Sequence, residues 1–122
     1  MKKILVIDDS AAAREQVKKV LEAKYDVIEA EDGPTGIKVA EENKSLSLII
    51  CDFNMPGGLN GLETIEKIRE VDHHQHTPIY MLTTESNNLM KHKGKELKLK
   101  AWVIKPCSDE RLQTVTQQIV PA

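Results

Sequence analysis

Short apolar runs alternate along the chain with longer segments in which apolar residues recur every three or four positions. The short runs have the length and apolar content of strands that a parallel sheet buries on both faces. They cover residues Ile4–Ile7, Asp26–Ala30, Leu46–Cys51, Pro78–Thr83 and Ala101–Ile104. Five strands are therefore predicted, each followed by a segment with the period of a helix.

The longer segments have the pattern of amphipathic helices that cover a sheet with one apolar face. Ser108 is a good N-cap for the last of them, and Asp32-Gly33-Pro34 has the pattern of a helix start. The apolar stripes are Val17, Val20 and Leu21; Ile37 and Ala40; Leu62, Ile65 and Ile68; and Leu112, Val115 and Ile119.

The segment 86–98 has fewer apolar positions than the other predicted helices. Its anchors are Leu89, Met90 and Leu97, and Gly94 interrupts its pattern, so we expect a loosely held helix. Five strands alternating with five helices predict an α/β fold with a doubly wound parallel sheet. Right-handed crossovers place helices on both faces of such a sheet.

The composition indicates one globular domain. With 122 residues, 40% of them hydrophobic, the chain can bury a core, and we expect a single domain over residues 1–122 with no output domain. A net charge of −2 argues against nucleic-acid binding, and no apolar run is long enough for a membrane span or signal peptide. Cys51 and Cys107 stand in no metal-binding spacing, so we expect a monomeric cytoplasmic protein with two reduced thiols.

Polar residues close four of the five predicted strands. They are Asp8 and Asp9 after the first strand, Asp52 after the third, Thr83 at the end of the fourth and Lys105 after the fifth. Ligands of open parallel sheets bind outside the carboxyl ends of the strands. We therefore expect these side chains to converge on one small site.

Three carboxylates in one place repel one another. At about 4 Å and an effective dielectric near 20, each like-charged pair costs about 4 kcal/mol. Lys105 supplies one positive charge, so a divalent cation is needed to balance the rest, and oxygen ligands favour Mg²⁺. A carboxylate beside Mg²⁺ and a lysine can attack a phosphoryl group and become an aspartyl phosphate. Lys105 and Thr83 could then stabilise the phosphoryl oxygens.

Five motifs point to a known family. They are Val6-Ile-Asp-Asp-Ser10, Ile50-Cys-Asp-Phe-Asn-Met-Pro56, Gly61-Leu-Glu63, Leu82-Thr-Thr-Glu85 and Trp102-Val-Ile-Lys-Pro106. With these motifs and their spacing, the chain resembles the receiver domains of two-component response regulators over essentially its whole length. It is most similar to the stand-alone chemotaxis regulators of that family. The resemblance implies a flavodoxin-like five-stranded parallel sheet, in the order 2-1-3-4-5, with five helices.

The resemblance also implies what the chain does. It implies a signalling switch that is not an enzyme, in which a histidine kinase phosphorylates Asp52 and Thr83 and Lys105 contact the phosphoryl oxygens. The implied Mg²⁺ ligands are Asp9, Asp52, the main-chain carbonyl of Asn54 and, through water, Asp8. Trp102 stands at the aromatic switch position, which turns inward when Thr83 moves toward the phosphate. A downstream protein would bind the face formed by the fourth helix, the fifth strand and the fifth helix.

The chain departs from the usual family pattern near this site and on the output face. The stretch Gly57–Asn60 is one residue longer than the commonest pattern, and Thr84 stands where a small residue is usual. Trp102 is bulkier than the usual Tyr or Phe, and Cys107 replaces a frequent Phe. Lys98-Leu99 replaces the usual Gly-Ala before the fifth strand. None of these departures removes a phosphorylation residue.

Three alternative functions fit part of the pattern. A phosphohydrolase of the haloacid-dehalogenase type also uses a strand-end Asp, but it needs a second Asp where this chain has Asn54. A flavin protein on the same fold needs a Ser, Thr and Gly loop after the first strand, where Asp8-Asp9 would repel phosphate. A degenerate receiver could act only as a binding scaffold, although the intact set of acids argues against it.

Two clusters of charged or titratable residues lie outside the strand ends. Lys91, Lys93, Lys95, Lys98 and Lys100 form a basic segment with one acid, Glu96. This segment is either a solvated helix face or a surface for an acidic partner. His73-His74-Gln75-His76 could bind a metal, but we expect an exposed loop at the end of the sheet opposite the carboxylates.

Overall fold

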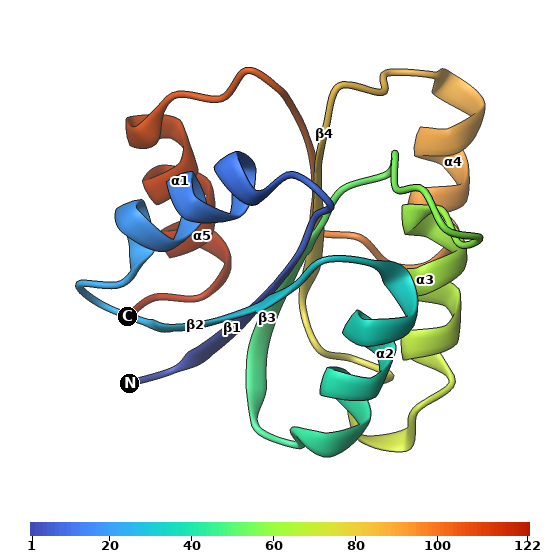
Figure 1. Cartoon of the computed structure of the whole chain (residues 1–122), viewed down its shortest axis with the longest axis horizontal. Helices are drawn as coiled ribbons and strands as arrows, with labels where there is room; N and C mark the ends of the chain where they lie inside the picture. The colour runs from blue at the N-terminus through green and yellow to red at the C-terminus, as the bar shows by residue number, and fades with distance from the viewer.

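A computed structural model describes all of residues 1–122 and has a five-stranded parallel sheet between two layers of helices (Figure 1). The strand order is β2-β1-β3-β4-β5, as the family resemblance implied. The elements are β1 (Lys3–Ile7), α1 (Ala11–Leu21), β2 (Asp26–Ala30), α2 (Gly33–Glu42), β3 (Leu46–Cys51), α3 (Gly61–Arg69), the 3₁₀ helix η1 (Asp72–His74), β4 (Ile79–Thr83), α4 (Asn88–Glu96), β5 (Ala101–Ile104) and α5 (Asp109–Ile119). No helix combines the length and apolar character needed to cross a bilayer.

The sheet separates two apolar cores. Because side chains of a strand alternate between faces, Ile4 and Val6 of β1 lie in the core beneath α1 and α5, and Leu5 and Ile7 lie in the core beneath α2, α3 and α4. Figure 1 shows these two groups of helices on opposite sides of the sheet. The central strands are buried on both faces, as predicted, but the edge strands β2 and β5 are partly exposed because only one neighbour covers each.

Side-chain caps set the N-termini of the helices. The side chains of Ser10, Asp32, Asn87 and Ser108 accept hydrogen bonds from the main-chain N–H groups of α1, α2, α4 and α5. Asn60 and Glu63 form a reciprocal capping box at the start of α3. Because the strands are parallel and each helix follows a strand, these capped helix starts lie at the edge of the sheet where the strands end.

Helix α4 corrects two of the sequence predictions. It runs without a break through Gly94, which is buried in the helix interior and does not interrupt it. A Cβ at this position would lie 2.8 Å from Leu99 Cδ1 and 3.4 Å from the ring of Trp102, so the missing side chain leaves room for both. Leu89 is 66% exposed and does not anchor the helix, whereas Met90 and Leu97 pack on the core.

The histidine segment also differs from the prediction. His74 is fully buried, although an exposed loop was expected. Its Nε2 lies 2.7 Å from the carbonyl oxygen of Ala40 and 2.9 Å from that of Asn43, and its Nδ1 lies 2.8 Å from Thr77 Oγ1. Carbonyl oxygens only accept, so Nε2 carries the proton and Nδ1 accepts from the threonine hydroxyl. This residue joins the end of α2 to η1, and hydrogen bonds within the protein use both of its ring nitrogens.

Candidate functional site

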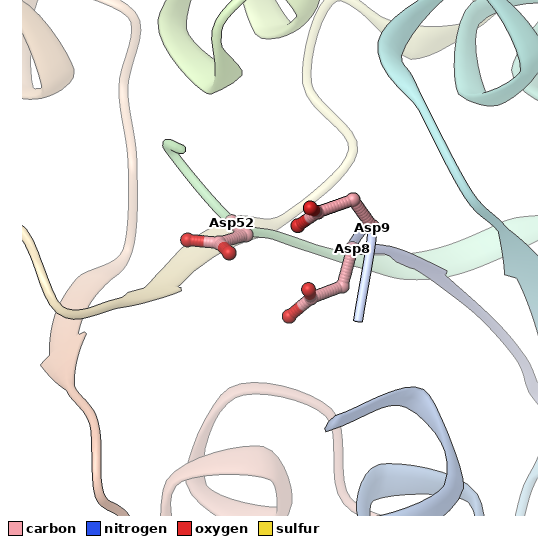
Figure 2. Close-up of side chains that lie close together, drawn as sticks. All are labelled: Asp8, Asp9 and Asp52. Atoms are coloured by element: carbon pink, nitrogen blue, oxygen red, sulfur yellow. The ribbon is translucent and has the colours of Figure 1, made fainter. Parts of the chain in front are cut away.

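Three carboxylates lie together at the carboxyl edge of the sheet (Figure 2). Asp8 and Asp9 follow β1 and Asp52 follows β3, which are adjacent strands in register. One carboxylate oxygen from each residue lies within 4.8 Å of the other two. Asp8 and Asp52 are buried and Asp9 is exposed, so the cluster opens to solvent on the Asp9 side.

Lys105 places its ammonium group beside two of these carboxylates. Its Nζ is 2.7 Å from Asp8 Oδ2 and 3.3 Å from Asp52 Oδ2. The position is set by the end of β5, where the main-chain N–H of Lys105 donates to the carbonyl of Thr83 on β4. The cluster therefore draws its side chains from the ends of β1, β3 and β5, three of the four strands whose ends were expected to converge.

The charges of the cluster do not balance. Burial raises the pKa of the Asp8 carboxyl above its usual value, although hydrogen bonds from Lys105 and Ser10 oppose the shift. Burial alone would lower the pKa of Lys105, but the hydrogen bond to Asp8 and the charges of Asp8 and Asp52 raise it overall. One ammonium group faces three carboxyl groups, and this donor set of hard oxygens with excess negative charge fits a divalent cation such as Mg²⁺.

Main-chain contacts hold the two buried aspartates in place. The guanidinium of Arg14 on α1 donates to the carbonyl of Asp8 at 2.7 Å and pairs with Glu29 at 3.1 Å. On the other side, α3 begins so close to Asp52 that a Cβ on Gly61 would clash with the Asp52 carbonyl. Gly61 also donates its N–H to the carbonyl of Phe53 at 2.8 Å. Sequence reasoning assigned no role to Arg14, whose place one turn into the helix after Asp8 was the available signal.

The loop after Asp52 forms one border of the site. Asn54 is exposed, and its main-chain N–H lies 3.4 Å from Asp52 Oδ1. Its side-chain amide lies 3.5 Å from the hydroxyl of Thr84, which follows β4. Gly57 and Gly58, in the stretch that is one residue longer than usual, have φ angles of 92° and 115°, a region that favours glycine.

The residues that precede α4 connect the site to β5. Thr83 is fully buried, and its Oγ1 accepts a hydrogen bond from the main-chain N–H of Glu85 at 3.3 Å. The carbonyl of Glu85 in turn accepts from Trp102 Nε1 at 2.7 Å. The resemblance implied Thr83 and Trp102 as a switch pair, and the structure shows a hydrogen-bonded connection between them through the main chain of Glu85, which the sequence did not indicate.

Comparisons with known proteins identify the family of this chain. The family described as "response regulator receiver domain" matches residues 4–117. The chemotaxis protein CheY homolog of Campylobacter jejuni is 30% identical over 120 residues, which are 97% of this chain and 92% of that protein. The transcriptional regulatory protein YdfI of Bacillus subtilis is 36% identical over 92% of this chain, but the match covers 52% of YdfI.

Solved structures of similar proteins have the same fold. CheY4 of Vibrio cholerae has a TM-score of 0.91 and 35% identity, with coverage of 98% of this chain and 99% of that one. TrrA of Thermotoga maritima, solved in complex with Mg²⁺ and BeF, has a TM-score of 0.85 and 29% identity, with coverage of 98% and 100%. These matches favour a receiver domain over the phosphohydrolase and the flavin protein that the sequence also allowed.

Proposed function

Because the chain belongs to the response regulator receiver domain family, we propose that it is a CheY-like phosphorylation switch in which Asp52 accepts a phosphoryl group from a histidine kinase. The observation that carries the proposal is the geometry around Asp52. This carboxylate is buried, lies 3.3 Å from the ammonium of Lys105 and shares its site with two further aspartates. The matches to small chemotaxis regulators cover most of this chain and most of those proteins. A chemotaxis pathway in the cytoplasm is therefore the proposed setting.

The carboxylate cluster is the proposed Mg²⁺ site. Asp9, Asp52 and the main-chain carbonyl of Asn54 would hold the ion directly, and Asp8 would act through water. When bound, Mg²⁺ supplies positive charge that neutralises the carboxylates and the phosphoryl oxygens. The Lys105 ammonium already occupies the Asp8 side of the cluster, and Asp9 is the exposed acid that an entering ion meets first.

The chain's own groups then account for the transfer. An oxygen of Asp52 attacks phosphorus, the bond from phosphorus to the donor nitrogen breaks, and the phosphoryl group ends on Asp52 as an acyl phosphate. Lys105 can move from the carboxylates to a phosphoryl oxygen, because it lies within hydrogen-bonding reach of Asp52. The hydroxyl of Thr83 is the proposed donor to a second phosphoryl oxygen.

Output is proposed to occur on the face formed by α4, β5 and α5. If Thr83 turns toward the phosphoryl group, its contact with the Glu85 N–H is lost, and the Glu85 carbonyl that holds Trp102 can move. The exposed lysines of α4, among them Lys93 and Lys95, fit an acidic or amphipathic partner whose binding weakens with salt.

Acetyl phosphate and intact-mass analysis test the central proposal. We expect the wild-type protein to gain one phosphoryl group in the presence of Mg²⁺ and to lose it in alkali, as an acyl phosphate does. Asp52→Asn should gain none, whereas Asp32→Asn, which removes a carboxylate from the same edge of the fold but not from the cluster, should label like wild type. Labelling of Asp52→Asn at the wild-type rate, or no labelling of any variant, would favour the scaffold function instead.

A further inference from the structure

A cavity of about 430 Å³ lies between α1, α5 and the residues that follow β5. Its apolar part is formed by Ala13, Leu82, Pro106 and Leu112, of which Leu82 and Leu112 are buried and form the floor. Lys105 and Thr84 also line it, and Lys105 Nζ lies 3.3 Å from Asp52 Oδ2, so the cavity borders the proposed phosphorylation site. Its volume falls within the range of about 300–1,000 Å³ that is typical of small-molecule sites.

Cys107 lines one wall of this cavity with the small side chain of a free, half-buried thiol. The amide of Gln16 on α1 donates to the carbonyl of Cys107 at 2.9 Å and to Asp109 at 3.1 Å, which fixes the distance between α1 and the start of α5. The cavity therefore lies between two helices that hydrogen bonds hold at a fixed separation.

Two residues of the cavity wall connect it to the surroundings of Asp52. Lys105 lines the cavity, and its Nζ lies 3.3 Å from Asp52 Oδ2. Thr84 lines the cavity as well, and its hydroxyl lies 3.5 Å from the side-chain amide of Asn54, in the loop after Asp52. A group that leaves phosphorus while Lys105 holds a phosphoryl oxygen therefore has room in this cavity.

We propose that this cavity is a subsite for the apolar body of small acyl phosphates, so that the protein takes phosphoryl groups preferentially from donors with an aromatic or other apolar leaving group. The inference rests on the proposed phosphorylation of Asp52. For benzoyl phosphate, an oxygen of Asp52 attacks phosphorus, the bond between phosphorus and the acyl oxygen breaks, and benzoate leaves with the electron pair. The phenyl ring packs on Leu82, Leu112 and Pro106, and no redox step or further reactant is needed.

The test compares benzoyl phosphate with acetyl phosphate as donors, both with Mg²⁺, by intact-mass kinetics. The measured quantity is the ratio of the two second-order rate constants, because the ratio within each variant cancels general damage to Asp52. Cys107→Phe and Ala13→Leu fill the cavity from two different walls. We expect each to lower the benzoyl-to-acetyl ratio about tenfold, the lower end of the 10- to 200-fold discrimination that an apolar pocket supplies for one added group.

Ala12→Leu is the matched control, because it makes the same change on the same helix at a position that does not line the cavity. It should keep the wild-type ratio, and circular dichroism should show that all variants fold. An unchanged ratio in both cavity-filling variants would overturn the proposal. The proposal would also be overturned if the cavity-filling variants lost only phosphotransfer from a phosphohistidine protein and kept the benzoyl-to-acetyl ratio. That result would assign the cavity to a protein partner. Absence of labelling by either donor would instead contradict the proposed function itself.

Discussion

Trp102 and Glu85 are joined by a hydrogen bond of 2.7 Å from the indole Nε1 to the main-chain carbonyl. The bond ties β5 to the segment before α4, and the same residue, Glu85, donates its N–H to Thr83. The ring of Trp102 lies against α4 where Gly94 has no side chain. A bulky aromatic therefore occupies a half-buried position that a helix with any larger residue at 94 would obstruct.

This connection predicts that activation at Asp52 changes the structure of residues 84–104. In wild-type protein, beryllofluoride with Mg²⁺ should shift amide resonances of residues 84–104 as well as those of the loops around Asp52. Thr83→Val keeps the shape but removes the hydroxyl, so at saturating beryllofluoride the shifts should stay near Asp52. The matched change at the exposed neighbour, Thr84→Val, should leave the wild-type pattern. If residues 84–104 do not move in wild type, this face is not the output surface.

Asp8→Asn should stabilise the metal-free protein and weaken Mg²⁺ binding. Burial raises the pKa of Asp8 in the folded state, so its contribution to stability is present at low pH and is lost as pH rises through that value. At pH 7 the amide avoids this loss, and we expect a gain of about 0.5–2 kcal/mol in the free energy of unfolding in EDTA, typical of relief at a functional site. Urea denaturation measures the gain, and Mg²⁺ titration of Trp102 fluorescence measures the weaker binding.

The gain in the free energy of unfolding of Asp8→Asn should shrink on acidification, because protonation of the wild-type carboxyl removes the same charge. A gain that is constant from pH 7 down to pH 4 would mean that the charge of Asp8 is not its cause. Asp32→Asn is a suitable contrast. Hydrogen bonds from Thr35 lower the pKa of Asp32, so this substitution should destabilise the protein at pH 7.

His74 should make the fold sensitive to mild acid. Burial lowers its pKa below the usual value, so the unfolded chain binds the proton more tightly and stability falls as pH drops through about 6.5. The slope from this residue can reach about 1.4 kcal/mol per pH unit. His74→Gln should cost about 1–3 kcal/mol at pH 7, because buried hydrogen bonds are lost, but its stability should change less between pH 7 and pH 5.

His92→Gln is the matched control for this experiment. His92 is exposed on α4 and pairs only with Glu96, so its loss should leave the wild-type pH dependence. Urea denaturation of both variants at pH 7, 6 and 5 decides the matter. A flattened profile for His92→Gln together with an unchanged profile for His74→Gln would show that the buried residue is not the acid-sensitive group.

Lys98→Gly should stabilise the protein by about 0.5–1 kcal/mol. Lys98 has a φ of 65°, in the left-handed region that costs little only for glycine. It follows the C-cap of α4, where the N–H of Leu99 donates to the carbonyl of Gly94 and that of Lys98 to Lys95, the pattern of a Schellman motif. The same change at Lys95, inside the helix, should instead cost about 1 kcal/mol. Thermal denaturation of the two variants compares them, and a loss of stability in Lys98→Gly would contradict the reasoning.

The sequence by itself determined the fold class and which side chains come together at the carboxyl edge of the sheet. Strand runs such as Leu46–Cys51 are apolar because a parallel sheet buries both faces, so their limits could be predicted from the pattern of apolar residues along the chain. Each is followed by the polar residue that ends it, and parallel strands present their carboxyl ends at one edge. Asp8, Asp52 and Lys105 therefore had to converge once the strand order was known.

Tertiary structure decided the roles that depend on neighbours far away in the chain. His74 looked like part of an exposed polar loop, but two carbonyls at the end of α2 satisfy its ring and allow its burial. Gly94 looked like a helix breaker, yet it gives space to Trp102, eight positions later along the chain. The cavity beside Lys105 exists only because α1, α5 and Cys107 meet there. No local pattern contains these contacts, since packing between elements depends on side-chain volumes that come together only in the folded chain.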